Sequence, residues 1–238
     1  MTTVVPALVG IAHGTSSADG QSAVAALMAS VAEANPELTV ALGFVDVQHP
    51  DTEETLESLP DGLPAIVVPL LLSAGYHVHV DLARAVRAAT GRATRLTGAL
   101  GPDERLTAML LRRLAEIGFG PDDALVLAVA GSSDARAVAD CRVVSEQLAA
   151  ASGHPVTIGF LSAAEPRLAD AIATARASHG GGRVVVSSYL LAPGFFHTLA
   201  QRAGADAVSS PLLVAHEPTP GLLVEVVVDR YRELRPSG

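Results

Sequence analysis

The chain has 238 residues, enough for one large domain or two small ones with hydrophobic cores. Its formal charge is −9, which argues against nucleic acid as a general partner. All 16 basic residues are arginine, which excludes mechanisms based on a P-loop or Schiff-base lysine. A single cysteine, apolar runs far shorter than the roughly 20 residues of a membrane span and an N-terminus unlike a signal peptide predict a cytoplasmic protein.

Along the chain, continuous apolar runs predict strands over 7–12, 38–45, 65–72, 124–130, 156–161 and 183–191. Helical patterns predict helices over 19–34, 51–58, 81–90, 103–117, 134–151, 166–178 and 219–234. The strand runs do not alternate with polar residues, which is typical of parallel strands that are covered on both faces. The order of strands and helices therefore predicts an α/β fold with right-handed crossovers.

The chain also repeats itself at a nearly constant offset. Three pairs of segments match: GFVDVQHP (43–50) with GFLSAAEP (159–166), LLSAGYH (71–77) with LLAPGFF (190–196), and GIAHGTSS (10–17) with AVAGSSDA (128–135). We therefore expect two homologous α/β domains, an N-terminal one over 1–119 and a C-terminal one over 120–238, joined by a Gly/Pro-rich segment.

The two copies differ at three polar positions. In this alignment the first copy's residues and their replacements are His13 and Gly131, Asp46 and Ser162, and His77 and Phe196. Residues that serve only folding should have structural equivalents in the other copy. The joint loss of all three predicts one functional unit, present in the N-terminal domain alone.

These three positions all follow strands, and ligands of open parallel sheets bind beyond the carboxyl ends of the strands. His13 follows the first strand, Asp46 ends the second and His77 follows the third. Two imidazoles and a carboxylate suit a divalent first-row metal with open coordination positions. Taken singly, each would more often be a loop histidine or a capping carboxylate. Their joint position favours a metal site.

Other histidines need a separate interpretation. His79 is two residues from His77, so in an extended chain it faces the opposite way, with Asp81 as the N-cap of the next helix. It is then either a substrate-facing or a surface residue. His49 is interpreted as a loop histidine, and His197 lies at the corresponding edge of the second sheet.

The segments VGIAHGTS, GFVDVQHPDTEETL and VPLLLSAGYHVHVDL resemble the CbiX/SirB group of class II chelatases, which insert a metal into sirohydrochlorin. The family's His-Gly motif, its acidic residue before a Pro-containing helix start and its Gly-x-His-Val motif match His13, Asp46 and His77. The family often has Glu at the position of Asp46, so this shorter carboxylate is either a metal ligand or a base. The resemblance covers the whole chain, as in the tandem members of the group, and implies two Rossmann-like or flavodoxin-like domains with one active site in a cleft between them.

The resemblance implies a lyase-type chelatase that uses no organic cofactor and no ATP. Fe²⁺ is the favoured metal, which would give sirohaem; insertion of Co²⁺ toward cobalamin and a non-enzymatic tetrapyrrole or metal carrier are the alternatives. A histidine phosphatase is disfavoured because Ala12 stands where those enzymes need an arginine before the histidine. The chain is expected to act as a monomer.

The anionic tetrapyrrole requires local positive groups in a protein of charge −9. Arg84 and Arg87 lie three residues apart on one predicted helix and are candidates for its carboxylates, although a solvated helix face explains them equally well. The N–H groups of a helix start around Thr15, Ser16 and Ser17 are a second candidate. Tyr76 and His79 complete the predicted substrate-binding set.

Overall fold

The computed structural model describes residues 4–73, 75–89 and 91–235, with side chains for all of them except 76–81. Its strands are β1 (Ala7–Ala12), β2 (Val40–Phe44), β3 (Ala65–Pro69), β4 (Thr94–Leu96), β5 (Ala124–Val129), β6 (Val156–Phe160), β7 (Val184–Tyr189) and β8 (Ala207–Val208). Its helices are α1 (Ala18–Ala34), α2 (Thr52–Glu57), α3 (Tyr76–Ala88), α4 (Glu104–Glu116), α5 (Ala135–Ser152), α6 (Leu168–Ser178), α7 (Phe195–Gln201) and α8 (Gly221–Glu233).

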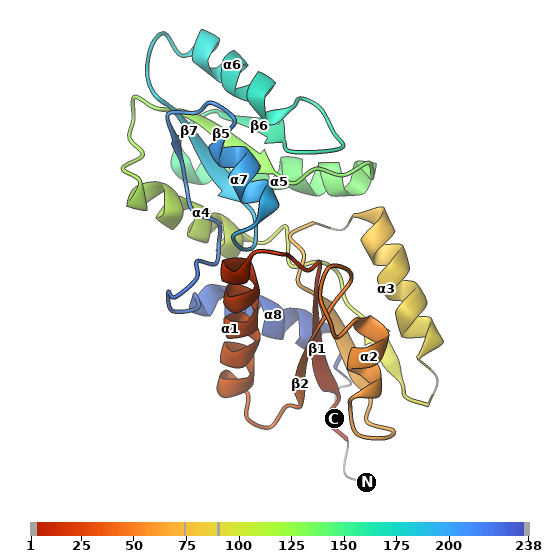
Figure 1. Cartoon of the computed structure of the whole chain (residues 1–238). Helices are drawn as coiled ribbons and strands as arrows, with labels where there is room; N and C mark the ends of the chain where they lie inside the picture. The colour runs from red at the N-terminus through yellow and green to blue at the C-terminus, as the bar shows by residue number, and fades with distance from the viewer. Residues whose placement is uncertain (1–3, 74, 90, 236–238) are drawn as a thin grey trace.

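The strands form two parallel sheets of four strands each, in the orders β2-β1-β3-β4 and β6-β5-β7-β8 (Figure 1). β1 and β5 are central and buried along their whole length, which explains their continuous apolar sequences. Helices cover both faces of each sheet. The predicted α/β class and the two similar domains, each with a parallel sheet flanked by helices, are confirmed.

Three elements escaped the sequence analysis. β4 and β8 are edge strands of three and two residues, too short to give an apolar run. α7 has seven residues and no side-chain cap. Packing against the rest of the sheet stabilises each of these short elements more than the intrinsic preference of its own sequence does.

The start of α3 was predicted wrongly. The helix begins at Tyr76, with Gly75 as an N-cap in extended backbone and no side-chain cap, so Asp81 lies inside the helix rather than before it. A glycine in extended conformation can start a helix without a capping side chain, and the Asp signal is therefore not decisive. His77 and His79 belong to the first helical turns and not to an extended segment.

The last helix of each half packs on the other half. α8 lies against α1 and β3, whereas α4 lies against β7 and α5, and Figure 1 shows α8 in the lobe of β1–β4. The Tyr231 hydroxyl, at the end of the chain, donates a 2.7 Å hydrogen bond to the carbonyl of Pro6 and is buried. Arg105 of α4 pairs with Asp229 of α8 at 2.7 Å. Through these contacts α4 and α8 hold the two lobes together. The predicted domain boundary between residues 119 and 120 stays a prediction.

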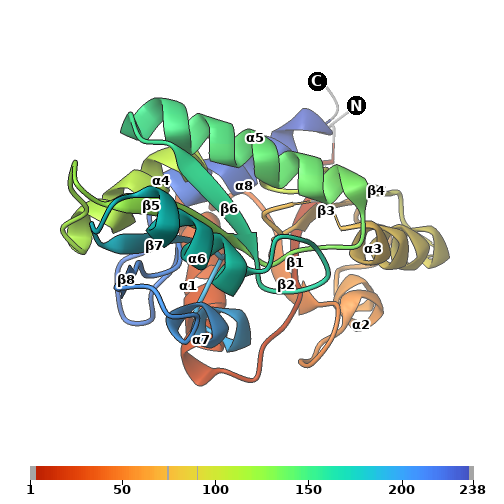
Figure 2. The same ribbon diagram turned by 90° about the horizontal axis from the view of Figure 1, so that it is seen from above.

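The carboxyl ends of the two sheets face each other. The Tyr189 hydroxyl, at the end of β7, donates to the carbonyl of Leu72, beyond the end of β3, at 3.0 Å. In Figures 1 and 2 α7 lies beside the start of α1, and the start of α5 lies beside the start of α3. Among the described residues, no helix combines the length and apolarity that a bilayer crossing requires.

Candidate metal centre

His13 is the first residue after β1, and it is exposed. Gly14 follows with φ +97°, a left-handed conformation that side chains other than glycine rarely adopt. A Cβ on Gly14 would overlap the carbonyl oxygen of Asp46. Glycine therefore lets the loop after β1 pass directly against the loop after β2.

Hydrogen bonds join these two loops at the predicted site. The N–H of Asp46 donates to the carbonyl of His13 at 3.0 Å, and the N–H of Val45 donates to the carbonyl of Ala12 at 2.9 Å. The Asp46 side chain is exposed, and its Oδ1 accepts the N–H of Val47 at 2.7 Å. The structure thus brings His13 and Asp46 together at an accessible edge of the sheet.

Gln48 is a residue of this site that the sequence analysis missed. Its Oε1 accepts the N–H of Thr15 at 2.9 Å, which fixes the loop after β1 to the loop after β2. Its counterpart in the second copy is Ala164. The repeat comparison that selected Asp46 would have selected Gln48 too, had neutral polar side chains been included.

The start of α1 was expected to offer free N–H groups to a substrate carboxylate. Thr15 donates its N–H to Gln48, and Ser17 donates its N–H to the Thr15 hydroxyl at 3.1 Å. Ser17 also caps the helix by accepting the N–H of Gly20 at 3.3 Å. Two of the three N–H groups thus have partners within the protein, and a substrate-binding role for Thr15 and Ser16 stays a prediction.

The third predicted ligand follows β3. The sheet order places β1 between β2 and β3, and the N–H of Leu70 donates to the carbonyl of Ile11 at 2.8 Å. The strand order reverses direction between β1 and β3, and this switch point is where open α/β sheets bind ligands. The backbone of His77 lies in the first turn of α3, which begins at this edge.

The side chains of Tyr76, His77 and His79 lie outside the described residues, so their roles stay predictions. Among the side chains that the structure describes, no three His, Cys, Asp or Glu residues are grouped to hold a metal ion. A third ligand beside His13 and Asp46, predicted to be His77 of α3, therefore stays a prediction.

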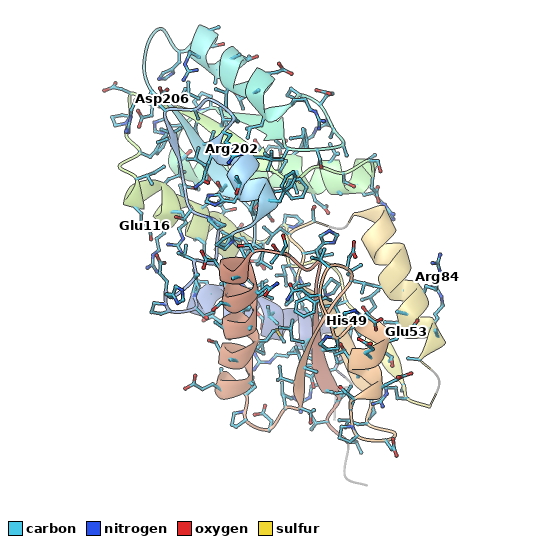
Figure 3. The ribbon with its side chains drawn as sticks, viewed as in Figure 1. His49, Glu53, Arg84, Glu116, Arg202 and Asp206 are labelled. Carbon is cyan, nitrogen blue, oxygen red and sulfur yellow. The ribbon has the colours of Figure 1, made fainter. Side chains whose placement is uncertain are left out.

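The two predicted arginines lie elsewhere. Arg84 and Arg87 are exposed, and Figure 3 shows Arg84 on the outer side of α3, pointing away from the sheet. Arg84 is seven residues beyond His77, which corresponds to about 10 Å along a helix axis. Arg84 thus lies away from the His13–Asp46 pair, and contact of either arginine with a substrate stays a prediction.

His49 is close in sequence to this site but has another partner. Its Nδ1 lies 2.8 Å from Oε2 of Glu54, in the turn that starts α2 (Figure 3). This hydrogen bond and the charge of Glu54 raise the pKa of His49. Glu54 in turn completes a capping box with Asp51. His49 is therefore part of a helix start.

The second copy repeats the backbone but not the chemistry. Gly131 has φ +90°, and a Cβ there would overlap the carbonyl oxygen of Ser162, as at Gly14. The N–H of Ser162 donates to the carbonyl of Ala130 at 2.9 Å, so Ala130 is the true counterpart of His13. The alignment with Gly131 was wrong by one residue, because it did not use these hydrogen bonds. The Ser162 hydroxyl also donates to Ala130, at 2.9 Å.

His197 is the histidine at the matching edge of the second sheet. It is half-buried, and its Nε2 lies 3.2 Å from the carbonyl oxygen of Ser209. Burial lowers the pKa of His197, because the charged imidazolium loses solvation. The partner that holds the His197 ring is thus a backbone group.

Three solved structures resemble this fold over nearly its full length. SirB from Bacillus subtilis with Fe³⁺ has a TM-score of 0.74 at 22% identity, covering 96% of this chain and 95% of that chain. The sirohydrochlorin chelatase SirB from Bacillus subtilis subspecies spizizenii in complex with cobalt has a TM-score of 0.74 at 20% identity, covering 96% and 94%. CbiX, described as the terminal enzyme for siroheme biosynthesis in denitrifying bacteria, has a TM-score of 0.64 at 19% identity, covering 94% and 98%.

At these identities the likeness shows the shared fold. A search of curated protein sequences gave no significant match. The CbiX family model matches the chain twice, over residues 7–117 and 124–207, which correspond to the two copies of the repeat. The matched residues make up most of the sequence, and the resemblance seen in the motifs around His13, Asp46 and His77 is thereby confirmed: the chain belongs to the CbiX family.

Proposed function

We propose that this protein is a chelatase that inserts a divalent metal into sirohydrochlorin, with Fe²⁺ as the favoured metal and sirohaem as the product. The proposal rests on one arrangement: exposed His13, which follows the central strand beside the switch point of a CbiX-family sheet, is hydrogen-bonded through its backbone to Asp46. The neighbouring strand β3 leads into the helix that carries His77.

The residues suit the chemistry of insertion. Two pyrrole N–H groups lose their protons as the metal enters the macrocycle, so the reaction releases two protons for each metal bound. Imidazoles exchange protons near neutral pH and bind first-row metals when they are neutral. His13 and His77 would hold the incoming metal and take up protons, while Asp46 would bind the metal or act as a base.

Cobalt is the alternative metal. Imidazole and carboxylate ligands accept both Fe²⁺ and Co²⁺. The two SirB structures that resemble this chain hold Fe³⁺ and cobalt respectively. Because both facing sheet edges come from one chain, we also propose that the monomer is the working unit.

The test is an anaerobic insertion assay with purified protein, free-base sirohydrochlorin and either Fe²⁺ or Co²⁺, followed by the change in visible absorbance. We expect many turnovers per protein molecule and a higher kcat/KM with Fe²⁺. Insertion no faster than in a protein-free control would contradict the enzyme proposal. Tight binding of metal or tetrapyrrole without turnover would instead identify a carrier.

A further inference from the structure

The second sheet edge carries an unusual exposed side chain. Among the described residues, the large hydrophobic side chains that are exposed are Val4, Val47, Val143, Phe195 and Leu222. Phe195 is the only aromatic residue in this set and has the largest exposed fraction, 71%. Single exposed apolar residues are common, so exposure alone does not indicate a ligand. Its position is more informative.

Phe195 and Phe196 occupy the positions that Tyr76 and His77 have in the first copy. Gly75 and Gly194 are the N-caps of α3 and α7, and each helix follows the third strand of its own sheet. The two phenyl rings are in contact, with centroids 5.8 Å apart and planes tilted by 55°. The second copy therefore has a pair of aromatic rings where the first has a predicted metal ligand.

Backbone contacts place this pair against the N-terminal domain. A Cβ on Gly20 of α1 would overlap the carbonyl oxygen of Pro193, and a Cβ on Gly194 would lie 3.1 Å from Oγ1 of Thr15. Thr15 is in turn fixed by Gln48 to the loop that carries Asp46. Phe195 thus directly follows a segment packed on Gly20 and on Thr15, which is two residues beyond His13, and Figures 1 and 2 show α7 beside the start of α1.

We infer that Phe195, supported by Phe196, packs against the flat conjugated face of the tetrapyrrole, so that the second domain provides a wall of the substrate site. This inference rests on the proposed function. A phenyl ring offers a large apolar area and favours offset or edge contacts with other π systems. Neither phenyl ring can bind the metal or accept the protons that leave the pyrrole N–H groups. These rings would therefore hold the macrocycle without competing with His13 for the metal ion.

The test compares Phe195→Ala with Val143→Ala, a matched exposed apolar residue on α5. Free-base tetrapyrrole is first titrated without metal, and insertion is then measured. We expect Phe195→Ala to raise the Kd and KM about tenfold, with kcat within about twofold and Co²⁺ binding unchanged. Phe195→Tyr should retain most of the affinity, and Val143→Ala should match the unaltered protein.

An unchanged Kd and KM in Phe195→Ala, in a protein whose unaltered form inserts metal, would overturn the role of Phe195 while leaving the proposed function intact. An equal weakening by Val143→Ala would overturn it as well, because the effect would then not be specific to the sheet edge. Lack of insertion by the unaltered protein would instead count against the proposed function, and the metal-free titration would still decide whether Phe195 contacts the macrocycle.

Discussion

The carboxyl edges of the two sheets share a backbone and differ in their side chains. Gly14 and Gly131 have left-handed φ values and pass equally close to the carbonyls of Asp46 and Ser162. Val47 and Ala163, which follow those residues, have φ values of +66° and +53°. Both copies thus retain the strained turn that brings the loops after their first two strands together.

The residues that differ are those able to do chemistry. Ala130 replaces His13, Ser162 replaces Asp46 and Ala164 replaces Gln48. Since the folded backbone is the same, none of the three first-copy residues is needed to form the turn. The comparison therefore separates what the loop needs to fold from what the site needs to function, and each difference can be tested by making one copy like the other.

The largest effect is expected from His13→Ala, which makes the first copy resemble the second at its central position. We expect the kcat of metal insertion to fall about 100-fold or more, because the site loses a ligand and a proton acceptor. The control is His49→Ala, since His49 lies at the same sheet edge but is bound to Glu54. Similar losses in both variants would show that the effect does not depend on the proposed centre.

Asp46→Ser should have the next largest effect. Ser162 occupies the same turn in the second copy, so the variant should fold, and we expect kcat to fall roughly 30-fold through loss of the carboxylate. Asp46→Glu should keep most of the activity. The matched change Ser162→Asp should leave insertion unaffected. Full activity of Asp46→Ser would remove this carboxylate from the mechanism.

Gln48→Ala copies Ala164 and should have a moderate effect. It leaves the N–H of Thr15 without its partner, which should lower the free energy of unfolding by about 1 kcal/mol. We expect kcat to fall about fivefold, because the loop that carries His13 is less well held. Urea unfolding and the insertion assay measure the two effects separately. A loss of stability without any change in kcat would make Gln48 purely structural.

The smallest effect is expected at His197, in the second copy. Burial lowers its pKa, so the unfolded chain takes up a proton at higher pH than the folded protein does. Stability is therefore unaffected above the usual pKa of about 6.5, decreases as the pH falls from there to the lowered value, and levels off below it. Because the group is only half-buried, His197→Gln should reduce this decrease by less than about 1 kcal/mol, measured by urea unfolding between pH 7.5 and 5.

Insertion by His197→Gln should stay within about twofold of the unaltered protein. A large loss of kcat would show that the second domain supplies a catalytic ligand, which would contradict the division of roles between the two copies.

Continuous apolar runs were enough to predict the six longer strands, because buried parallel strands need such sequences. The edge strands β4 and β8 were missed because two or three residues carry no periodicity. The pairing of His13 with Asp46 could be predicted, since both follow neighbouring strands. The start of α3 could not, because a glycine in extended backbone replaced the expected capping side chain.

The packing of α4 and α8, each on the other half of the chain, also could not be predicted from the sequence. An amphipathic helix has the same pattern of apolar residues whichever sheet it packs on. The patterns of α4 and α8 therefore do not show which sheet each helix covers. Gln48 was missed for a different reason: its role is a single hydrogen bond to the N–H of Thr15, 33 residues away in the chain, which no local pattern reveals.

The most direct test of the division between the copies is to locate a metal ion by anomalous scattering from crystals of the protein prepared with Co²⁺. The account predicts a peak at the carboxyl edge of the first sheet, about 2.1 Å from a ring nitrogen of His13, as is usual for imidazole bound to such metals. A peak at His197 or elsewhere on the second domain, with none at His13, would contradict it.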